Sequence, residues 1–203
     1  MTRGARKEVS RCPWVGISDA EYTRYHDEEW GVPLTTDRAL FEKLTLEGFQ
    51  SGLSWITILR KRENFRRAFD RFDPERIAAY RAKDVARLMN DEGIVRNRAK
   101  IEATINNAKA YLALRKRTTL KKFLWDFFDD GPVANTFATM SEIPAQTDIS
   151  KRIAKALKAE GFNFVGPTTA YAFMQSAGMV NDHLVSCFRH AECAKLQRTK
   201  AAR

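Results

Sequence analysis

Apolar residues recur at helical spacing along almost the whole chain. They fall three or four positions apart in one segment after another, and no stretch alternates convincingly as a strand would. The segments are Leu40, Phe41, Leu44; Ile77, Val85, Leu88, Met89; Ile101, Ile105, Ala108, Leu112; Phe123, Leu124, Phe127, Phe128; and Ile153, Ala156, Leu157. The pattern predicts an all-α protein of about eight or more helices.

Residues that start and stop helices lie where the pattern needs them. Thr36-Asp37 can cap the segment that follows, and Asp73-Pro74-Glu75 puts proline at a first helical position. Gly161 can close a helix that runs from about Asp148 to Glu160. We therefore expect helix starts near residues 37 and 74 and a helix end near 160.

The chain divides into a folded region and two tails. Residues 1–11 and 194–203 are basic and rich in small residues, so we predict flexible tails there. Between them, 12–193 is predicted to form one domain, with a helical core over 36–179 and a lobe built from its two ends, 12–35 and 180–193. The longest connection is expected around 130–147.

The composition of the chain favours some classes of binding partner and excludes others. The 203 residues carry 35 Lys and Arg against 25 Asp and Glu, a net charge of +10, which favours a polyanion. The 44% of hydrophobic residues is enough for a core and excludes wholesale disorder. No run reaches the roughly 18 apolar residues of a membrane helix, and the first residues do not resemble a secretory signal. We expect no membrane partner and a cytoplasmic protein, associated with the nucleoid if DNA is the partner.

Histidine and cysteine gather at the two ends of the folded region. An odd set of three cysteines argues against a disulfide framework. His183-x3-Cys187 places two ligands one helical turn apart, which suits two corners of a tetrahedral zinc site. Cys12 and His26 could complete a closed structural site, but His190-x2-Cys193 is a competing pair, and ordinary core packing is an alternative for all of them.

Aromatic residues and one carboxylate are concentrated between Tyr22 and Trp55. Tyr22, Tyr25, Trp30 and Trp55 could form a slot in which an extruded nucleobase stacks. Glu47 is the acid expected at this pocket, where it would accept a hydrogen bond from an exocyclic amine and favour a cationic ring. Core packing and a solvated helix face are the alternatives.

Two further features suggest contacts with DNA. Gly52-Leu53 could wedge into the gap that an extruded base leaves, or could be a simple turn between helices. Residues 151–183 read as a basic helix, a turn bounded by Gly161 and Gly166, and a second helix. The amides near Thr168 and Thr169 could bind phosphate. The basic residues assigned to this role are Lys151, Arg152, Lys155 and Lys158 before the hairpin, and Arg96, Arg98 and Lys100 near a second turn.

Several segments together resemble the DNA-3-methyladenine glycosylase I family of the helix-hairpin-helix glycosylases. They are Arg-Cys-Pro-Trp at 11–14, Tyr-His-Asp-Glu-Glu-Trp-Gly-Val-Pro at 25–33, Leu-Glu-Gly-Phe-Gln-Ser-Gly-Leu-Ser-Trp at 46–55, Gly-Ile-Val-Arg-Asn-Arg at 93–98, and the stretch 164–183. The resemblance runs from Arg11 to about Cys187, although Cys12 and His26 stand one residue further apart than is usual in the family.

The resemblance implies the fold of that family and excision of N3-methyladenine from duplex DNA. It implies a structural zinc on Cys12, His26, His183 and Cys187, so His190 and Cys193 are not expected to be ligands. It places Glu47 as the catalytic and base-binding acid, with Tyr25, Trp30, Trp55 and Tyr22 around the base. We expect a monomer that needs no protein partner.

The resemblance also bears on the chemistry. The aspartate that assists cleavage in most helix-hairpin-helix glycosylases aligns with Asn181, and Asp182 is either a helper or the cap of the last helix. No lysine is placed as a nucleophile, which implies a monofunctional enzyme that leaves an abasic site. The rival interpretations are another methylpurine specificity such as 3-methylguanine, a zinc-stapled DNA-binding protein without catalysis, and an RNA-binding module.

Overall fold

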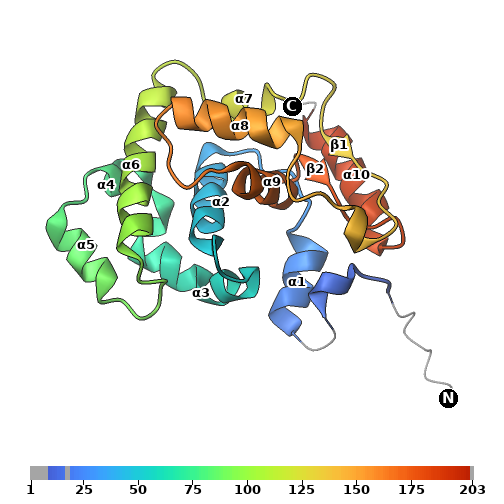
Figure 1. Cartoon of the computed structure of the whole chain (residues 1–203), viewed down its shortest axis with the longest axis horizontal. Coiled ribbons are helices and arrows are strands. Elements are labelled where there is room, and N and C mark those ends of the chain that lie inside the picture. Colours follow the sequence, from blue (N-terminus) through green and yellow to red (C-terminus); the bar gives the residue numbers. More distant parts are fainter. Residues whose placement is uncertain (1–8, 17–18, 202–203) are drawn as a thin grey trace.

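Helix α2 (Asp37–Gln50) lies at the centre of the molecule. The computed structural model describes residues 9–16 and 19–201. All residues of α2 from Leu40 to Phe49 are buried except Glu42, because α3, α6, α7 and α9 pack around the helix. In Figure 1, α4, α5 and α6 lie on one side of α2, and α1, α10 and the strands lie on the other.

The described part of the chain is mostly helical, as the pattern predicts. Ten α-helices are present in it: α1 Ala20–Glu28, α2 Asp37–Gln50, α3 Trp55–Ala68, α4 Pro74–Ala78, α5 Ala82–Met89, α6 Arg98–Arg115, α7 Leu120–Trp125, α8 Asp148–Ala159, α9 Pro167–Ser176 and α10 Phe188–Ala201. Three short 3-10 turns accompany them: η1 Pro13–Val15, η2 Asp70–Phe72 and η3 Met140–Glu142. No described helix is both long and apolar enough to cross a membrane.

The predicted helix boundaries are confirmed. The Thr36 side chain accepts a hydrogen bond from the Ala39 amide at 3.3 Å and caps α2. Asp73 caps α4, and Pro74 is the first residue of that helix. Helix α8 ends at Ala159, and Gly161 follows it at a φ of +89°. Local cap chemistry was enough to locate these ends.

A short pair of strands was not predicted. β1 (Val133–Ala134) pairs in parallel with β2 (Val180–Asn181) and attaches the connection after α7 to the segment before α10. Two residues are too few for a period of two to stand out in a sequence. The pair nevertheless fixes the long connection on the side of the molecule that carries the site.

The described parts of the two predicted tails make contacts with the rest of the fold. The Ser10 carbonyl accepts a hydrogen bond from the Phe188 amide at 3.0 Å, and Arg11 pairs with Asp27 at 2.6 Å. At the other end, α10 continues through 194–201, because Gln197 lies one turn after the buried Cys193 and donates to the Gly178 carbonyl at 3.0 Å. Residues 1–8 and 202–203 lie outside the described residues.

Gly178 allows α9 to end directly against the connection between α1 and α2. Its φ is +69°, and a Cβ atom there would lie 2.4 Å from the Pro33 nitrogen. Gly131 has a φ of +83° but open space around the missing Cβ. Both glycines have a left-handed backbone, but only Gly178 would clash if it carried a side chain. Comparing alanine variants at the two positions therefore distinguishes the cost of the backbone conformation from the cost of the clash.

We expect Gly131→Ala to lower the free energy of unfolding by about 1–2 kcal/mol, the cost of a left-handed non-glycine residue. Gly178→Ala adds a backbone clash to the same cost, so the loss is expected to be at least about twice as large, or the variant fails to fold. Urea denaturation of both variants measures the difference. Equal losses would contradict a close approach at Gly178.

Candidate functional site

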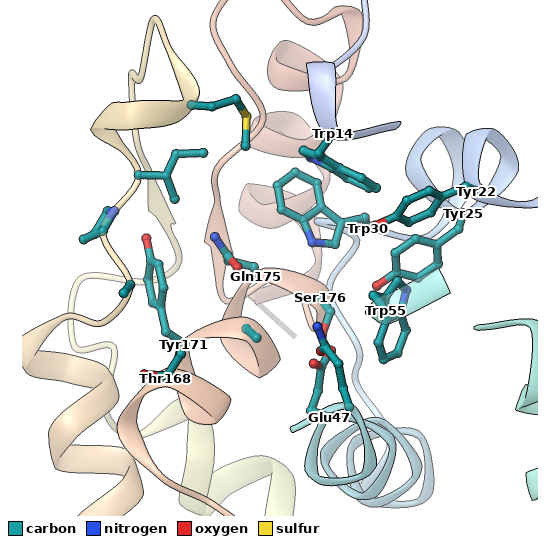
Figure 2. Close-up of a pocket in the computed structure, with 16 residues that line it drawn as sticks. Trp14, Tyr22, Tyr25, Trp30, Glu47, Trp55, Thr168, Tyr171, Gln175 and Ser176 are labelled. Carbon is teal, nitrogen blue, oxygen red and sulfur yellow. The ribbon is translucent and has the colours of Figure 1, made fainter. Parts of the chain in front are cut away.

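A cavity of about 370 Å³ opens between α1, α2, α3, α9 and the η3 turn (Figure 2). Its lining is largely aromatic on one side and polar on the other. The residues around it are Trp14, Tyr22, Tyr25, Trp30, Glu47, Gln50, Trp55, Met140, Ile143, Pro144, Ala145, Thr168, Tyr171, Ala172, Gln175 and Ser176. The five residues that sequence reasoning placed at a base pocket are all among them.

The aromatic side forms a cup around the cavity. The ring centroids of Tyr25 and Trp55 are 5.3 Å apart at 42°, and those of Trp14 and Trp30 are 5.1 Å apart at 73°. Trp14 also contacts Tyr22, with centroids 4.9 Å apart. The rings are tilted to one another, so the structure presents an angled cup where a parallel-sided slot was expected. Flat ring faces and edges are still available to a planar ligand.

Glu47 lies at the bottom of the cavity, on α2, with only 3% of its surface exposed. The Ser176 hydroxyl donates a hydrogen bond to Glu47 Oε1 at 2.8 Å. Burial raises the pKa of Glu47 to about 7, against the attraction of the Lys43 ammonium and the bond from Ser176. The carboxyl group is therefore poised to change its charge near neutral pH.

Lys43 is a buried cation that sequence reasoning did not identify. Its Nζ lies 4.9 Å from the ring centroids of both Tyr25 and Trp55 and donates to the Tyr25 hydroxyl at 3.4 Å. Burial lowers the pKa of Lys43 to about 8, and the charge of Glu47 opposes that shift. The ammonium lies one helical turn before Glu47 and favours its ionised form.

The polar side of the cavity is formed by α9. Tyr171 and Gln175 lie across from Tyr25 and Trp55 in Figure 2. Both donate to the carboxylate of Asp182, the Tyr171 hydroxyl at 2.6 Å and Gln175 Nε2 at 2.8 Å. Asp182 itself is 1% exposed and does not line the cavity.

The two candidates for assistance in bond cleavage thus both lie outside the cavity. Asn181 Nδ2 donates to the His190 carbonyl at 2.9 Å, and Asn181 Oδ1 accepts from the His183 amide at 3.2 Å. Asp182 does not cap the last helix, since α10 begins at Phe188. Neither side chain is placed to touch a ligand in the cavity.

The structure brings Cys12, His26, His183 and Cys187 together at the ends of the folded region. All four are buried, and their ligand atoms lie within 4.8 Å of one another. The Cys12 and Cys187 sulfurs are each 3.6 Å from His183 Nδ1, and the Cys187 sulfur is 3.5 Å from His26 Nε2. This cluster could hold a metal ion.

The distances in the cluster fit zinc. Two ligands on a tetrahedral zinc, one sulfur at 2.3 Å and one nitrogen at about 2.05 Å, are about 3.6 Å apart. The remaining ring nitrogens are also held: His26 Nδ1 is 2.7 Å from Asp27 Oδ1, and His183 Nε2 is 3.0 Å from the Trp30 carbonyl oxygen. Such partners orient the other nitrogen of each ring toward a metal.

The competing pair does not join the cluster. His190 Nε2 lies 2.7 Å from the Asn135 carbonyl oxygen, and the Cys193 sulfur lies 3.8 Å from the Trp30 carbonyl oxygen. Gly31 leaves room for Cys193 and for the His183 ring, because a Cβ atom there would lie 3.1 Å from the ring and 3.2 Å from the Cys193 sulfur. His190 and Cys193 therefore have structural roles.

The predicted DNA contacts lie on the surface in two groups. Gly52, at a φ of +81°, and Leu53, which is 42% exposed, form the turn between α2 and α3. Gly161 and Gly166 are exposed in the turn between α8 and α9, and Thr169 is half-buried in the first turn of α9. Thr168 lines the cavity as well.

One basic residue has a different role from the one expected. Lys100 is 7% exposed, and its ammonium donates to the carbonyls of Phe49 at 2.8 Å and Ser51 at 2.5 Å. It therefore caps the end of α2 and is not available to bind phosphate. The same bonds brace the turn that carries Leu53.

Sequence reasoning missed part of the cavity. The residues it did not place there are Trp14, Gln50, Met140, Ile143, Pro144, Ala145, Thr168, Tyr171, Ala172, Gln175 and Ser176, together with Lys43 next to the Tyr25 and Trp55 rings. Two features of the sequence could have indicated some of these residues. Lys43 precedes Glu47 by four residues, and Thr168, Tyr171 and Gln175 follow one face of a helix at spacings of three and four.

A helical fold with an aromatic cup over a buried carboxylate is the kind of site that suits a flat, cationic ring. Comparison with known proteins shows to which family the chain belongs. The methyladenine glycosylase family model matches residues 14–190. A DNA-3-methyladenine glycosylase of Haemophilus influenzae is 50% identical over 180 residues, covering 88% of this chain and 97% of that protein. The chain belongs to the methyladenine glycosylase family.

Solved structures give the same result for the fold. A crystal structure of 3-methyladenine DNA glycosylase I superposes with a TM-score of 0.86 at 51% identity, over 88% of this chain and 98% of that one. The 3-methyladenine DNA glycosylase I of Staphylococcus aureus, solved to explain its recognition of 3-methyladenine, superposes at 0.84 with 38% identity, over 88% and 95% of the two chains.

We expect Lys43→Met to raise the pKa of the Glu47 carboxyl group above its value of about 7, because the ammonium is the main charge that favours the carboxylate. Carboxyl ¹³C shifts followed by NMR between pH 5 and 9 measure this directly. Lys109→Met, at an exposed position of α6, is the control and should leave the titration unchanged. A Glu47 titration that is the same in Lys43→Met and wild type would contradict the coupling.

Proposed function

We propose that the protein excises N3-methyladenine from alkylated duplex DNA by hydrolysing the N-glycosidic bond. The observation that carries the proposal is the buried Glu47 carboxyl at the bottom of the aromatic cup. A base can reach it only after extrusion from the duplex. Membership of the methyladenine glycosylase family and the names of the relatives support this substrate.

The base itself supplies much of the reactivity. N3-methyladenine is a cation that leaves the sugar as a neutral base, so its glycosidic bond is already weak. The protein then needs mainly to extrude, stack and orient the base. Tyr22, Tyr25, Trp30 and Trp55 stack on it, and Glu47 accepts from the exocyclic amine and favours the cationic ring.

Water attacks the sugar carbon in this proposal, and no lysine forms a covalent intermediate. Lys43 does not line the cavity, and its ammonium lies 4.9 Å from the ring centroids of Tyr25 and Trp55. The amide of Asn181 and the carboxylate of Asp182 both lie outside the cavity, so neither assists by direct contact. The product is an abasic site on an intact strand.

Two surface features engage the DNA. Leu53 is exposed between Gln50 and Trp55, which both line the cavity, so it is placed to fill the gap that the extruded base leaves. Helices α8 and α9 act as a helix-hairpin-helix, with Gly161 and Gly166 in its turn. The first amides of α9, at Thr168 and Thr169, bind the DNA backbone without reading sequence.

We also propose that the Cys/His cluster holds a structural zinc ion. Four protein ligands leave no open position, so zinc supplies folding energy there and no reaction chemistry. The metal then joins 12–35 to 180–193 as one lobe of a single domain. The protein acts as a monomer on DNA and, with DNA as its substrate, at the nucleoid in the cytoplasm.

The test of the function is chromatography of the bases released from methylated duplex DNA. We expect wild type to release 3-methyladenine and to leave strands that break only on alkaline treatment. Glu47→Gln should lower the release roughly tenfold to a hundredfold, the range for a hydrogen bond to a charged group.

Glu75→Gln on α4, an exposed glutamate remote from the cavity, is the control and should act as wild type. Release of other methylpurines in preference would favour a different specificity. Binding of duplex DNA without any release would favour the interpretation of a DNA-binding protein that lacks catalysis.

The test of the metal site uses two of the cysteines as a matched pair. Purified wild type should contain close to one zinc ion per chain by elemental analysis. Cys187→Ala should lose the metal and unfold at lower temperature, whereas Cys193→Ala, a buried cysteine outside the cluster, should keep it. Folded wild-type protein without metal would contradict the proposal.

A further inference from the structure

Asp182 is a buried carboxylate whose oxygens are occupied by donors. Oδ1 accepts from Asn135 Nδ2 at 2.6 Å, and Oδ2 accepts from the Tyr171 hydroxyl at 2.6 Å and from Gln175 Nε2 at 2.8 Å. The side chain is 1% exposed and lies behind the α9 side of the cavity. Tyr171 and Gln175 therefore separate this anion from any ligand in the cavity.

A carboxylate can only accept hydrogen bonds, which fixes how its two neighbours are oriented. The amide of Gln175 must turn its nitrogen to Asp182, so its carbonyl oxygen is the end left for the cavity. The Tyr171 hydroxyl likewise commits its proton to Asp182 and keeps only lone pairs. Among the contacts made within 9–16 and 19–201, no donor is bonded to Gln175 Oε1.

We propose that Gln175 is a specificity-determining residue: held by Asp182, it presents a hydrogen-bond acceptor that favours a purine with an amino group at C6 over one with a carbonyl oxygen there. The inference rests on the proposed function and names the feature of the base that is selected. Asp182 acts through Gln175 and is a positioning residue.

The two bases differ in just this respect. The C6 substituent of 3-methyladenine is an amine that donates, whereas that of 3-methylguanine is an oxygen that accepts. An oxygen facing Gln175 Oε1 would place two acceptors together and leave both without a donor, which is the kind of mismatch that binding sites reject most strongly. Glu47 is a second acceptor at the bottom of the same cavity and acts in the same direction.

Tyr171 extends the acceptor side of the cavity. Burial and the bond to Asp182 raise the pKa of the Tyr171 hydroxyl well above its usual range, so this proton stays in place at all working pH values. Tyr171 therefore keeps donating to Asp182 and presents only lone pairs to the cavity.

The experiment measures both bases released from one preparation of methylated duplex DNA. In wild type, 3-methyladenine should be released with a large preference over 3-methylguanine. Gln175→Leu removes the acceptor and should reduce the ratio of the two kcat/KM values about tenfold, the effect of one hydrogen bond near the upper end of its range. Gln197→Leu removes another buried glutamine side chain, on α10 and outside the cavity, and should leave the ratio unchanged.

The outcomes separate this inference from the proposed function. No release of 3-methyladenine by wild type overturns the function itself. Release with an unchanged ratio in Gln175→Leu overturns the inference and leaves the function standing. A fall in the release of both bases by the same factor also overturns it, because a merely structural role would have that effect.

A second measurement tests the orientation without any change to the working protein. The side-chain amide signals of Gln175 are assigned by their absence from the spectrum of Gln175→Leu. A bond to the Asp182 carboxylate should shift one of the two amide protons downfield and slow its exchange. Two amide protons that exchange at the rate of a free glutamine would overturn the role of Asp182.

Discussion

The site depends on the packing of the two ends of the chain against each other. Cys12 and His26 meet His183 and Cys187 across separations of 171 and 161 residues. Two rings of the aromatic cup rest on this cluster: the Trp30 centroid is 4.6 Å from that of His183, and the Trp14 centroid is 5.2 Å from that of His26. If the ends separated, half of the cup would lose its support. The structural zinc proposed for this cluster would therefore support the cavity without taking part in the reaction.

The other half of the cup depends on buried charge in α2. Burying Lys43 and Glu47 in the central helix is unfavourable, and the shifts of both pKa values toward neutrality show it. Each charge lessens the cost of the other, since they lie one turn apart, and Ser176 and Tyr25 supply hydrogen bonds. A helix chosen for stability alone would carry apolar residues there. Proteins accept such local conflicts where function requires them.

Much of the fold could be predicted because its signals are local. The caps at Thr36 and Asp73 and the glycine at 161 act within one helical turn, and they located the ends of three helices. The strands β1 and β2 could not be predicted, because a pair of two residues is formed only when α10 and the connection after α7 are already in place. A last helix was expected, but its continuation through 194–201 was not, because Cys193 and Gln197 are buried by tertiary contacts that a basic sequence rich in small residues does not indicate.

The same distinction applies to the site. Sequence reasoning placed Tyr25, Trp30 and Glu47 around one cavity because family motifs carried them. It did not place Gln175 or Tyr171 there, and it left open whether Asp182 assists cleavage or caps the last helix. The spacing of the sequence puts Tyr171 and Gln175 on one face of α9, but it does not show that this helix lies beside the strand that precedes α10. Asp182 lies behind the cavity, where it accepts hydrogen bonds from Tyr171 and Gln175.

Selectivity for a cationic base then follows from the burial of the Glu47 carboxyl group beside Lys43. Glu47, with a pKa of about 7, is held close to the point where it loses its proton, because burial opposes the anion that Lys43 favours. A cationic ring stacked in the cup supplies the opposite charge that burial removed, so binding and ionisation of Glu47 stabilise each other. A neutral adenine brings no such charge and leaves the carboxylate with only Lys43 and Ser176 to stabilise it. In this proposal the cavity distinguishes damaged from normal base by electrostatics, and the acceptor side formed by Gln175 and Tyr171 distinguishes one damaged purine from another.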